Sequence, residues 1–490
     1  MDLPLLIGVL AYEIIVIVGL GLWLQRRHSA AARDEFALAG RDLPVPVVAV
    51  TLALTVLGTA HILGVFEMTW MMGAIAVWFS IAHVILLTFV CLGTGVWVRR
   101  LGVATVPELL DRAYTLEIRL MVSCVMAGVL FGILTVEAQG IGIIFATLTD
   151  WSIQTGAIVG GVLGILYVIF AGMREIGWVN LVNAIVMYAG LIAATVFVGL
   201  ALPDGGYAAV GESYRLAGEE SALSIWGTRD LFMNFALVNV VAVVFSQSVN
   251  QMLLQPAMAA KSESTIRKAL WIAAPINGMF GVFAVILALA ARAQPEFAGL
   301  PDAPKIGVTT MLVNYLPPWL GALLLASFLA AILSTFAIIA LSIATIFTKD
   351  IFQALYAPKA SERQLTFMIR LVIIIVASIA IAVASLLPPI LAAMIWLFAW
   401  LVPVFWILMA GLLWRRNSFV AGLTLLGAWA ANFVWSFTSL PLQLGFENPG
   451  ALNAYVTALV SAVVVILGTI ILGGRPGLLR ETMSASGEGA

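Results

Sequence analysis

The sequence is poor in charged residues. Only 10% of its 490 residues are Asp, Glu, Lys or Arg, whereas 62% are hydrophobic. A water-soluble domain carries roughly 25% charged residues, so this composition excludes a soluble enzyme, a nucleic-acid-binding protein and a disordered scaffold. The net charge of −1 comes without a basic block that would bind nucleic acid. What remains is a polytopic protein whose surroundings are a lipid bilayer.

Cysteine is also scarce. Cys91 and Cys124 both lie in apolar runs, which predicts two free, buried thiols and no disulfide framework. The sequence also lacks a nucleotide-binding motif and the ligand spacings of haem, iron–sulfur or zinc sites. These absences argue against an ATP-driven pump and against a membrane-embedded enzyme.

Long apolar runs dominate what is present. A helix needs about 20 apolar residues to cross the hydrocarbon core of a bilayer. Thirteen such runs follow one another, at 3–25, 44–66, 73–98, 118–149, 153–173, 176–202, 230–256, 267–291, 318–347, 364–387, 389–414, 418–438 and 451–473. They predict an all-α polytopic membrane protein with about thirteen transmembrane helices.

Basic residues orient the chain, because cytoplasmic segments carry an excess of Lys and Arg. If the N-terminus lies outside, only four of the 24 basic residues fall on the outer side, namely Arg215, Arg229, Arg292 and Lys305. We therefore expect the N-terminus outside and the C-terminus in the cytoplasm. The membrane is expected to be the plasma (cytoplasmic or inner) membrane.

Small and polar residues interrupt the run at 44–66. Thr55, Gly58, Thr59 and His61 lie near its centre. Transporters use broken helices of this kind to present backbone carbonyls and half-helix ends to ions and solutes. The alternative is that Gly58 is a packing contact between helices, and both interpretations stay open.

Two adjacent hydroxyls, Ser334 and Thr335, lie in the middle of the run at 318–347, shortly after Ala331. Hydroxyl and carbonyl oxygens are ligands that hard cations prefer. Hydroxyls in a helix also bond back to the preceding turn, which is the structural alternative.

Glu137 and Gln139 lie near the middle of the run at 118–149. An acid inside a membrane must pair, become protonated or face water. Three roles stay open for Glu137: holding a cationic solute, carrying a proton, or a structural hydrogen bond to a neighbouring helix.

Two other patterns are candidates for a site. The polar run that includes Ser246 and Asn250 indicates either a second helix break or hydrogen bonding between helices. Trp396 and Trp400 are four residues apart and would form one wall of a pocket. We interpret His83 as structural.

Four stretches carry a family resemblance when they are read together. They are Gly40-Arg41-Asp42-Leu43, Thr105-Val106-Pro107-Glu108, Asn250-Gln251 with Gln255 and Ala259-Ala260-Lys261-Ser262, and Ala344-Thr345-Ile346-Phe347-Thr348-Lys349-Asp350-Ile351. In their order, spacing and fit to the predicted spans, the sequence resembles the solute/sodium symporter family. That family includes sodium-coupled sugar, proline and sialic acid transporters.

The resemblance implies a five-plus-five inverted-repeat (LeuT-like) core with one leading and two trailing helices. The chain would then divide into a leading helix and cytoplasmic loop (1–43), a first repeat (44–202), an outer loop (203–229), a second repeat (230–414), two trailing helices (415–480) and a polar tail (481–490).

The resemblance also implies a coupling Na⁺ held by backbone carbonyls and hydroxyls, on Leu54, Leu57, Ala331, Ser334 and Thr335. Some members have a second sodium site. The aligned positions here are Asn180, Ala337 and Ile338, and an amide with two apolar groups cannot replace that site. We therefore expect a single sodium site.

The aligned solute pocket would contain Val56, Thr59, His61, Phe79, Glu137, Gln139, Ser246, Asn250, Trp396 and Trp400. Sugar-binding members carry polar residues where this chain has Val56 and Phe79, so a sugar is not expected. A half-helix N-terminus favours a carboxylate, whereas Glu137 with tryptophan faces favours an amine or quaternary ammonium. We expect an amino acid, an amine or a carboxylate.

These features together predict a sodium-coupled symporter that imports a small polar or charged organic solute by alternating access. Two alternatives stay open. One is proton coupling through Glu137 or His61. The other is a transporter-like membrane protein that senses a solute.

Overall fold

The computed structural model describes residues 3–19, 23, 35–149, 151–170, 172–203, 205–384, 390–446 and 452–485. Helices make up nearly all of the regular structure in these residues, and β1 (Arg415–Arg416) pairs with β2 (Arg475–Pro476) in a short antiparallel ribbon. Ten of the described helical segments are long and apolar enough to cross a membrane, and three shorter apolar helices accompany them. The predicted all-α polytopic class is confirmed, while the count of thirteen spans stays a prediction.

The first half of the chain begins with α1 (Leu3–Glu13) and η1 (Ile14–Gly19), where η marks 3-10 and π segments. Its remaining elements are α3 (Glu35–Leu38), η2 (Ala39–Arg41), α4 (Val45–Thr55), α5 (Thr59–Met72), η3 (Gly73–Ala76), α6 (Val77–Phe89), η4 (Val90–Thr94), α7 (Gly95–Leu101), α8 (Val106–Ala113), α9 (Leu116–Leu148), α10 (Ile153–Phe170) and α11 (Met173–Ala201).

The second half begins with α12 (Tyr207–Leu216), η5 (Glu220–Leu223), α13 (Arg229–Leu231) and η6 (Phe232–Ala236). It continues with α14 (Leu237–Gln247), α15 (Gln251–Met258), α16 (Glu263–Arg292), α17 (Pro295–Ala298), α18 (Ala303–Tyr315), α19 (Pro318–Ile346), η7 (Phe347–Tyr356), α20 (Glu362–Val383), α21 (Ile390–Ala399), α22 (Val402–Leu413), α23 (Ser418–Phe437), α24 (Leu440–Gln443), α25 (Asn453–Leu472) and α26 (Leu478–Ala485).

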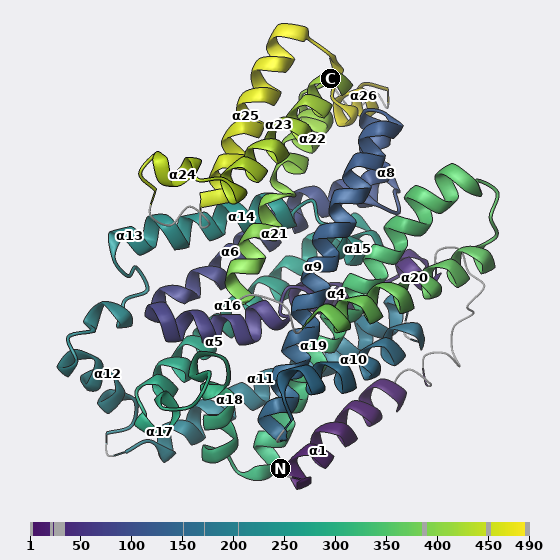
Figure 1. Ribbon diagram of the computed structural model, residues 1–490. Helices are drawn as coiled ribbons and strands as arrows, with labels where there is room; N and C mark the ends of the chain where they lie inside the picture. Colours follow the sequence, from purple (N-terminus) through teal and green to yellow (C-terminus); the bar gives the residue numbers. More distant parts are fainter. Residues whose placement is uncertain are drawn as a thin grey trace.

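Helix α19 forms the centre of the molecule (Figure 1). Every residue from Leu324 to Ile346 is buried, as expected for a helix that is apolar on all sides. Helices α1, α4, α9 and α11 pack against it. The two hydroxyls predicted as ion ligands therefore lie deep inside the bundle.

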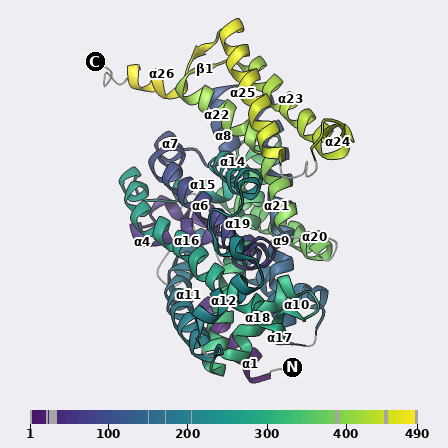
Figure 2. The ribbon, with the colours of Figure 1, turned by 90° about the vertical axis from the view of Figure 1, so that its left-hand side faces the viewer.

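The trailing helices stand apart from this centre. Helix α23 packs against α25, and α22 contacts both. Figure 2 shows this group projecting from one side of the main body, next to the C-terminus. The ribbon of β1 and β2 ties the start of α23 to the end of α25.

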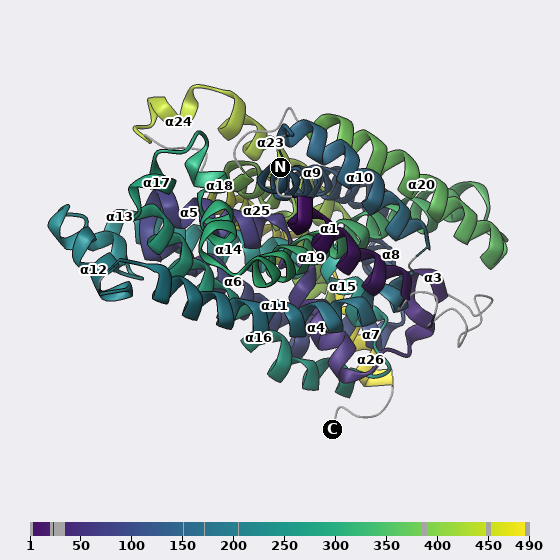
Figure 3. The same cartoon turned by 90° about the horizontal axis from the view of Figure 1, so that it is seen from below.

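The predicted outer loop (203–229) lies beside the segment that follows α16. In Figures 1 and 3, α12, α13 and α17 gather at the left of the molecule, and Figure 3 shows α3 toward the opposite end. An ion pair joins the two loop regions, with Arg292 Nη2 2.7 Å from Glu219 Oε2. Both loops therefore reach the same face, as the predicted topology requires.

Both predicted helix breaks are present. Helix α4 ends at Thr55 and α5 starts at Thr59, and between them Gly58 is extended with φ −85° and ψ −159°. Helix α14 ends at Gln247 and α15 starts at Gln251. The side chain of Asn250 caps α15 by accepting a hydrogen bond from the Met252 amide at 3.2 Å.

A third break lies where the sequence predicts one continuous span at 389–414. Helix α21 ends at Ala399 and α22 starts at Val402, with Pro403 in its first turn. Proline has no amide proton to continue the hydrogen bonds of a helix and is best accommodated in a first turn, which agrees with a new helix starting just before Pro403.

The two cysteines are free thiols, as predicted. Cys91 is buried, but Cys124 is exposed, so the prediction of two buried thiols is wrong for the second. Apolar surroundings in the sequence do not separate a helix face in the protein core from one that faces lipid.

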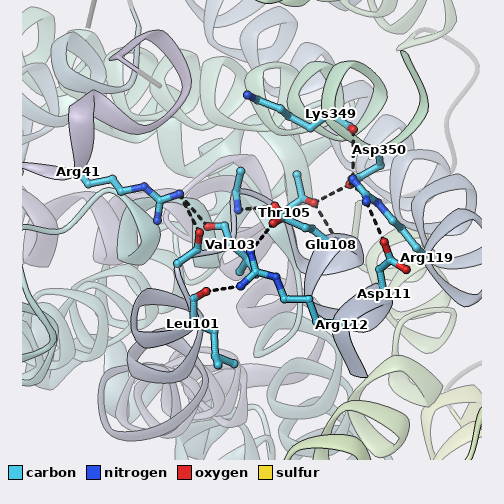
Figure 4. Close-up of polar contacts among 12 residues, drawn as sticks. Arg41, Leu101, Val103, Thr105, Glu108, Asp111, Arg112, Arg119, Lys349 and Asp350 are labelled. Atoms are coloured by element: carbon cyan, nitrogen blue, oxygen red, sulfur yellow. Dashed lines mark hydrogen bonds and ion pairs between the residues drawn. The ribbon is translucent and has the colours of Figure 1, made fainter. Parts of the chain in front are cut away.

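The four stretches that carry the family resemblance contact one another. The Leu43 amide donates to the Ala259 carbonyl at 3.1 Å, and the Lys261 amide donates to the Leu43 carbonyl at 3.0 Å, which joins the first stretch to the third. Thr105 Oγ1 donates to Asp350 Oδ1 at 2.7 Å, joining two of the stretches directly (Figure 4).

Glutamines of the third stretch link the remaining parts of this cluster. Gln251 Oε1 accepts from the Val106 amide at 2.9 Å, and Gln255 Nε2 donates to the Ala37 carbonyl at 2.9 Å. The stretches thus form one connected network of hydrogen bonds at one end of the bundle.

A buried ion pair anchors this network. Asp350 is fully buried, and its Oδ1 lies 2.8 Å from Arg119 Nη2, which is itself only 12% exposed. Arg119 also pairs with Asp111 at 3.1 Å, and Figure 4 shows the guanidinium between the two carboxylates. The pair connects the start of α9 to η7.

Replacing Arg119 with Met should destabilise the protein strongly, because Asp350 would be left buried without its counter-ion. Loss of one partner of a buried pair costs about 3–5 kcal/mol. Thermal unfolding of the purified protein in detergent measures the loss. Arg215→Met is the matched control, because Arg215 and Glu212 are both more than half exposed and such pairs contribute about 0–1 kcal/mol. Equal losses in both variants would refute a stabilising role for the buried pair.

Candidate functional site

A buried carboxylate meets the start of α5 at the first helix break. Glu137, on α9, is 2% exposed, and its Oε2 accepts a hydrogen bond from the Thr59 amide at 2.8 Å. The first amides of a helix have no partner within the helix and carry partial positive charge. Glu137 therefore stabilises the half-helix that begins at Thr59.

Two glycines make this close approach possible. A Cβ at Gly58 would collide with Glu137 Oε1 and would lie 2.7 Å from Oε2. On the other side of the contact, a Cβ at Gly140 would collide with Thr59 Oγ1. The absence of side chains at both positions lets α9 lie directly against the break, so Gly58 serves both the break and the packing.

The candidate sodium ligands gather between α4 and α19. Thr335 Oγ1 lies 3.1 Å from the Leu54 carbonyl oxygen and 3.0 Å from that of Ala331. Ser334 Oγ lies 2.8 Å from the same Ala331 oxygen. Leu57 lies in the break itself, and its amide donates to the Leu54 carbonyl at 3.0 Å.

This donor set fits a small hard cation. Thr335 Oγ1 lies within hydrogen-bonding distance of both carbonyl oxygens and Ser334 Oγ of one of them, and hydroxyl and carbonyl oxygens have lone pairs that can bind an ion. Ser334 makes only the bond back to its own helix that the structural alternative requires. Thr335 also reaches across to α4, a contact that helix back-bonding does not explain.

A cavity lies beside these oxygens. Its volume is about 20 Å³, room for about one water molecule, so an organic solute requires its walls to move apart. The walls are formed by Thr55, Val56, Gly58, Ala60, Phe79, His83, Ile133, Glu137, Gln247, Met252, Thr335, Met394 and Phe398. Thr335 and Glu137 thus face the same space.

Three of the predicted solute residues line this cavity, namely Val56, Phe79 and Glu137. Thr59 lies next to it and is bonded to Glu137 through its amide. Gln139 does not line it: two residues after Glu137, it lies about 200° further round the helix.

His61 lies on a different face of α5. Its Nε2 is 2.6 Å from Ser80 Oγ, and its ring centroid is 4.8 Å from that of His83. His83, interpreted from the sequence as structural, lines the cavity. His61 packs against His83 and is not part of the cavity wall.

Ser246 and Asn250 lie in the polar segment around the second break. Ser246 Oγ accepts from Gln247 Nε2 at 3.2 Å, and Asn250 Nδ2 donates to Gln247 Oε1 at 3.1 Å. Of the three, Gln247 lines the cavity. The polar run in the sequence identifies the segment that forms this wall of the cavity. Which of its residues lines the cavity depends on where α14 ends.

Trp396 and Trp400 contact the trailing helices. Trp396 Nε1 donates to Ser436 at 3.2 Å, and the Trp400 carbonyl accepts from Trp429 Nε1 at 2.9 Å. The cavity is lined instead by Met394 and Phe398 of α21. Each lies two residues from Trp396 and hence on nearly the opposite face of that helix. Met394 and Phe398 are also four residues apart, a spacing that would have placed them on one helix face from the sequence alone.

The model of the sodium:solute symporter family matches residues 36–426. Among relatives, the uncharacterized symporter YidK of Escherichia coli is 25% identical over 84% of this chain and 75% of its own length. The sodium/glucose cotransporter of Vibrio parahaemolyticus is 22% identical over 78% of this chain and 75% of its own length.

Among solved structures, a Na⁺-coupled sialic acid symporter in a substrate-bound outward-open state superposes with a TM-score of 0.81. It is 15% identical, and the match covers 96% of this chain and 98% of that one. This likeness shows the fold, which is the LeuT-like fold that the sequence predicts. Because the family model matches most of its length, the chain belongs to the sodium:solute symporter family, and Na⁺ is its coupling ion.

Proposed function

We propose that the protein is a secondary active symporter that imports a small polar or charged organic solute together with Na⁺ by alternating access. The position of Thr335 carries the proposal. Its hydroxyl lies 3.1 Å from the Leu54 carbonyl among the candidate ion ligands, and the same residue lines the cavity that contains Glu137. An ion and a solute that share a wall in this way influence each other's binding, which is the condition for coupling.

The proposed sodium site consists of the carbonyls of Leu54, Leu57 and Ala331 and the hydroxyls of Ser334 and Thr335. The distances between Thr335, Leu54 and Ala331 support it. A second site of the kind found in some relatives lacks support, because Ala337 and Ile338 offer no side-chain oxygen. One ion crossing with the solute gains about 2.3 kcal/mol per 100 mV of membrane potential.

The proposed solute site is the cavity at the first break, with Val56, Phe79 and Glu137 in its walls and Thr59 behind Glu137. An amino acid, amine or carboxylate fits this mixture of apolar walls and one acid better than a sugar does. The remaining candidates lie outside the walls in this conformation and would enter only after helices move; they are His61, Gln139, Ser246, Asn250, Trp396 and Trp400.

The two inverted repeats are proposed to span 44–202 and 230–414. Their support is that the first helix of each is broken, at Val56–Gly58 and at Ser248–Asn250. We place the N-terminus outside and the C-terminus in the cytoplasm of the inner membrane, because this assigns most basic residues to the cytoplasmic side.

Changing Ser334 to Ala together with Thr335 to Val should raise the sodium concentration that half-stabilises the protein at least tenfold. The double variant keeps the side-chain volumes nearly constant and removes both hydroxyl ligands. A sodium titration of thermal unfolding measures the effect, with choline chloride holding ionic strength constant. Ser327→Ala is the control, since Ser327 is buried on the same helix and bonds only to the Leu324 carbonyl. An unchanged sodium response in the double variant would exclude this site.

A thermal-stability screen against amino acids, amines, carboxylates and sugars, each in sodium and in potassium, should reveal the solute. A ligand at 100 times its Kd stabilises by about 2.7 kcal/mol. We expect compounds that shift the unfolding temperature only when sodium is present. A shift that ignores sodium but follows pH would favour proton coupling, for which Glu137 and His61 are the candidate carriers. Binding without uptake into liposomes would favour a sensor.

A further inference from the structure

The start of α5 is the place where a helix break would offer amide groups to an anionic solute. In this protein that place is filled. Thr59 donates its amide to Glu137 Oε2 at 2.8 Å, and the Glu137 carboxyl group lies so close that Gly58 has no room for a Cβ. The protein supplies its own carboxylate where a carboxylate of the solute would bind.

The charge of the cavity walls also disfavours an anionic solute. Among its wall residues, Glu137 is the only acid, and neither Lys nor Arg contributes to the walls. A carboxylate entering this space would meet a like charge in a low-dielectric site and would find no cationic side chain to pair with. A cation would instead compensate a buried charge that is costly when it stands alone.

The apolar part of the walls is also suited to a cation. Phe79 and Phe398 both line the cavity, and aromatic faces attract ammonium groups when water is excluded. Met394 and Met252 complete an adaptable apolar surface. None of these four side chains has a hydrogen-bond donor that could hold a carboxylate in place of the occupied helix start.

We propose that the solute is an organic cation, a small amine or quaternary ammonium compound without a carboxylate group, and that Glu137 is its counter-ion. This inference rests on the proposed function, because it assigns the substrate class of the same cavity. It excludes zwitterionic amino acids and monocarboxylates, which the sequence left open.

Matched pairs of compounds test the proposal directly. Choline and glycine betaine share a trimethylammonium group, and isobutylamine and valine share an amine and a branched chain; only the second of each pair has a carboxylate. We expect sodium-dependent stabilisation and uptake into proteoliposomes with the first member at concentrations at least tenfold lower. If the carboxylate-bearing members act equally well or better, the substrate class is wrong, while the same sodium dependence would leave the symporter function intact.

The Glu137→Gln variant distinguishes a role of Glu137 as counter-ion to the solute from a purely structural role at the helix break. The amide oxygen can still accept from the Thr59 amide, so the break should persist, but the charge is lost. Binding of the preferred cation should weaken at least tenfold, and the sodium response in the absence of solute should change less than twofold. Equal weakening for cationic and neutral solutes would show that Glu137 only positions the break and would overturn the proposal.

Gly58→Ala provides a second, independent variant, because the added methyl group must push the Glu137 carboxyl group aside. Cation binding should weaken as in Glu137→Gln. Gly128→Ala is the control on the same helix as Glu137, since a Cβ there meets nothing within 4 Å, and it should bind cations as the parent does. Full cation affinity in a folded Gly58→Ala protein would contradict the assignment.

Discussion

A carboxylate held against the start of a buried half-helix is the contact on which the centre of this protein depends. Helix α5 begins inside the bundle, where water does not reach the amides that a helix start leaves unpaired. Glu137 pairs with the first of these amides, and this requires glycine at 58 and at 140 so that α9 can approach. The break, the packing of α9 and the polarity of the cavity all follow from that one pairing.

The central helix α19 brings the candidate ion ligands close to the same break. Ser334 bonds only within its own helix, as Ser327 does. The approach of α4 at its broken end instead gives Thr335 a partner in the Leu54 carbonyl. The Leu54 carbonyl oxygen at the broken end of α4 and a hydroxyl of α19 thus lie side by side, an arrangement of two oxygens that neither helix offers alone.

The sequence predicted where the helices break at this site better than it predicted which side chains line the cavity. Glycine and clustered polar residues mark helix breaks because they act on the backbone where they stand, and both predicted breaks are present. Which face of a helix meets the cavity depends on the packing of distant segments. The rings of Trp396 and Trp400 contact each other, as their spacing implies, but Trp396 bonds to Ser436 of α23 and neither ring lines the cavity. The sequence contains Pro403, but a proline alone does not show whether a span is continuous or broken. The break becomes evident only from the turn that precedes α22 in the structure.

The segments by which the family is recognised form a separate device. At one end of the bundle Thr105 and Arg119 both bond to Asp350, and Gln251 bonds to the Val106 amide. None of these side chains lines the cavity. Thr105 and Arg119 share Asp350 as their partner, so the segments at this end can separate only if these bonds part together. The side chains that line the cavity and those that hold this end together are therefore different sets, and a substitution in one set leaves the contacts of the other in place.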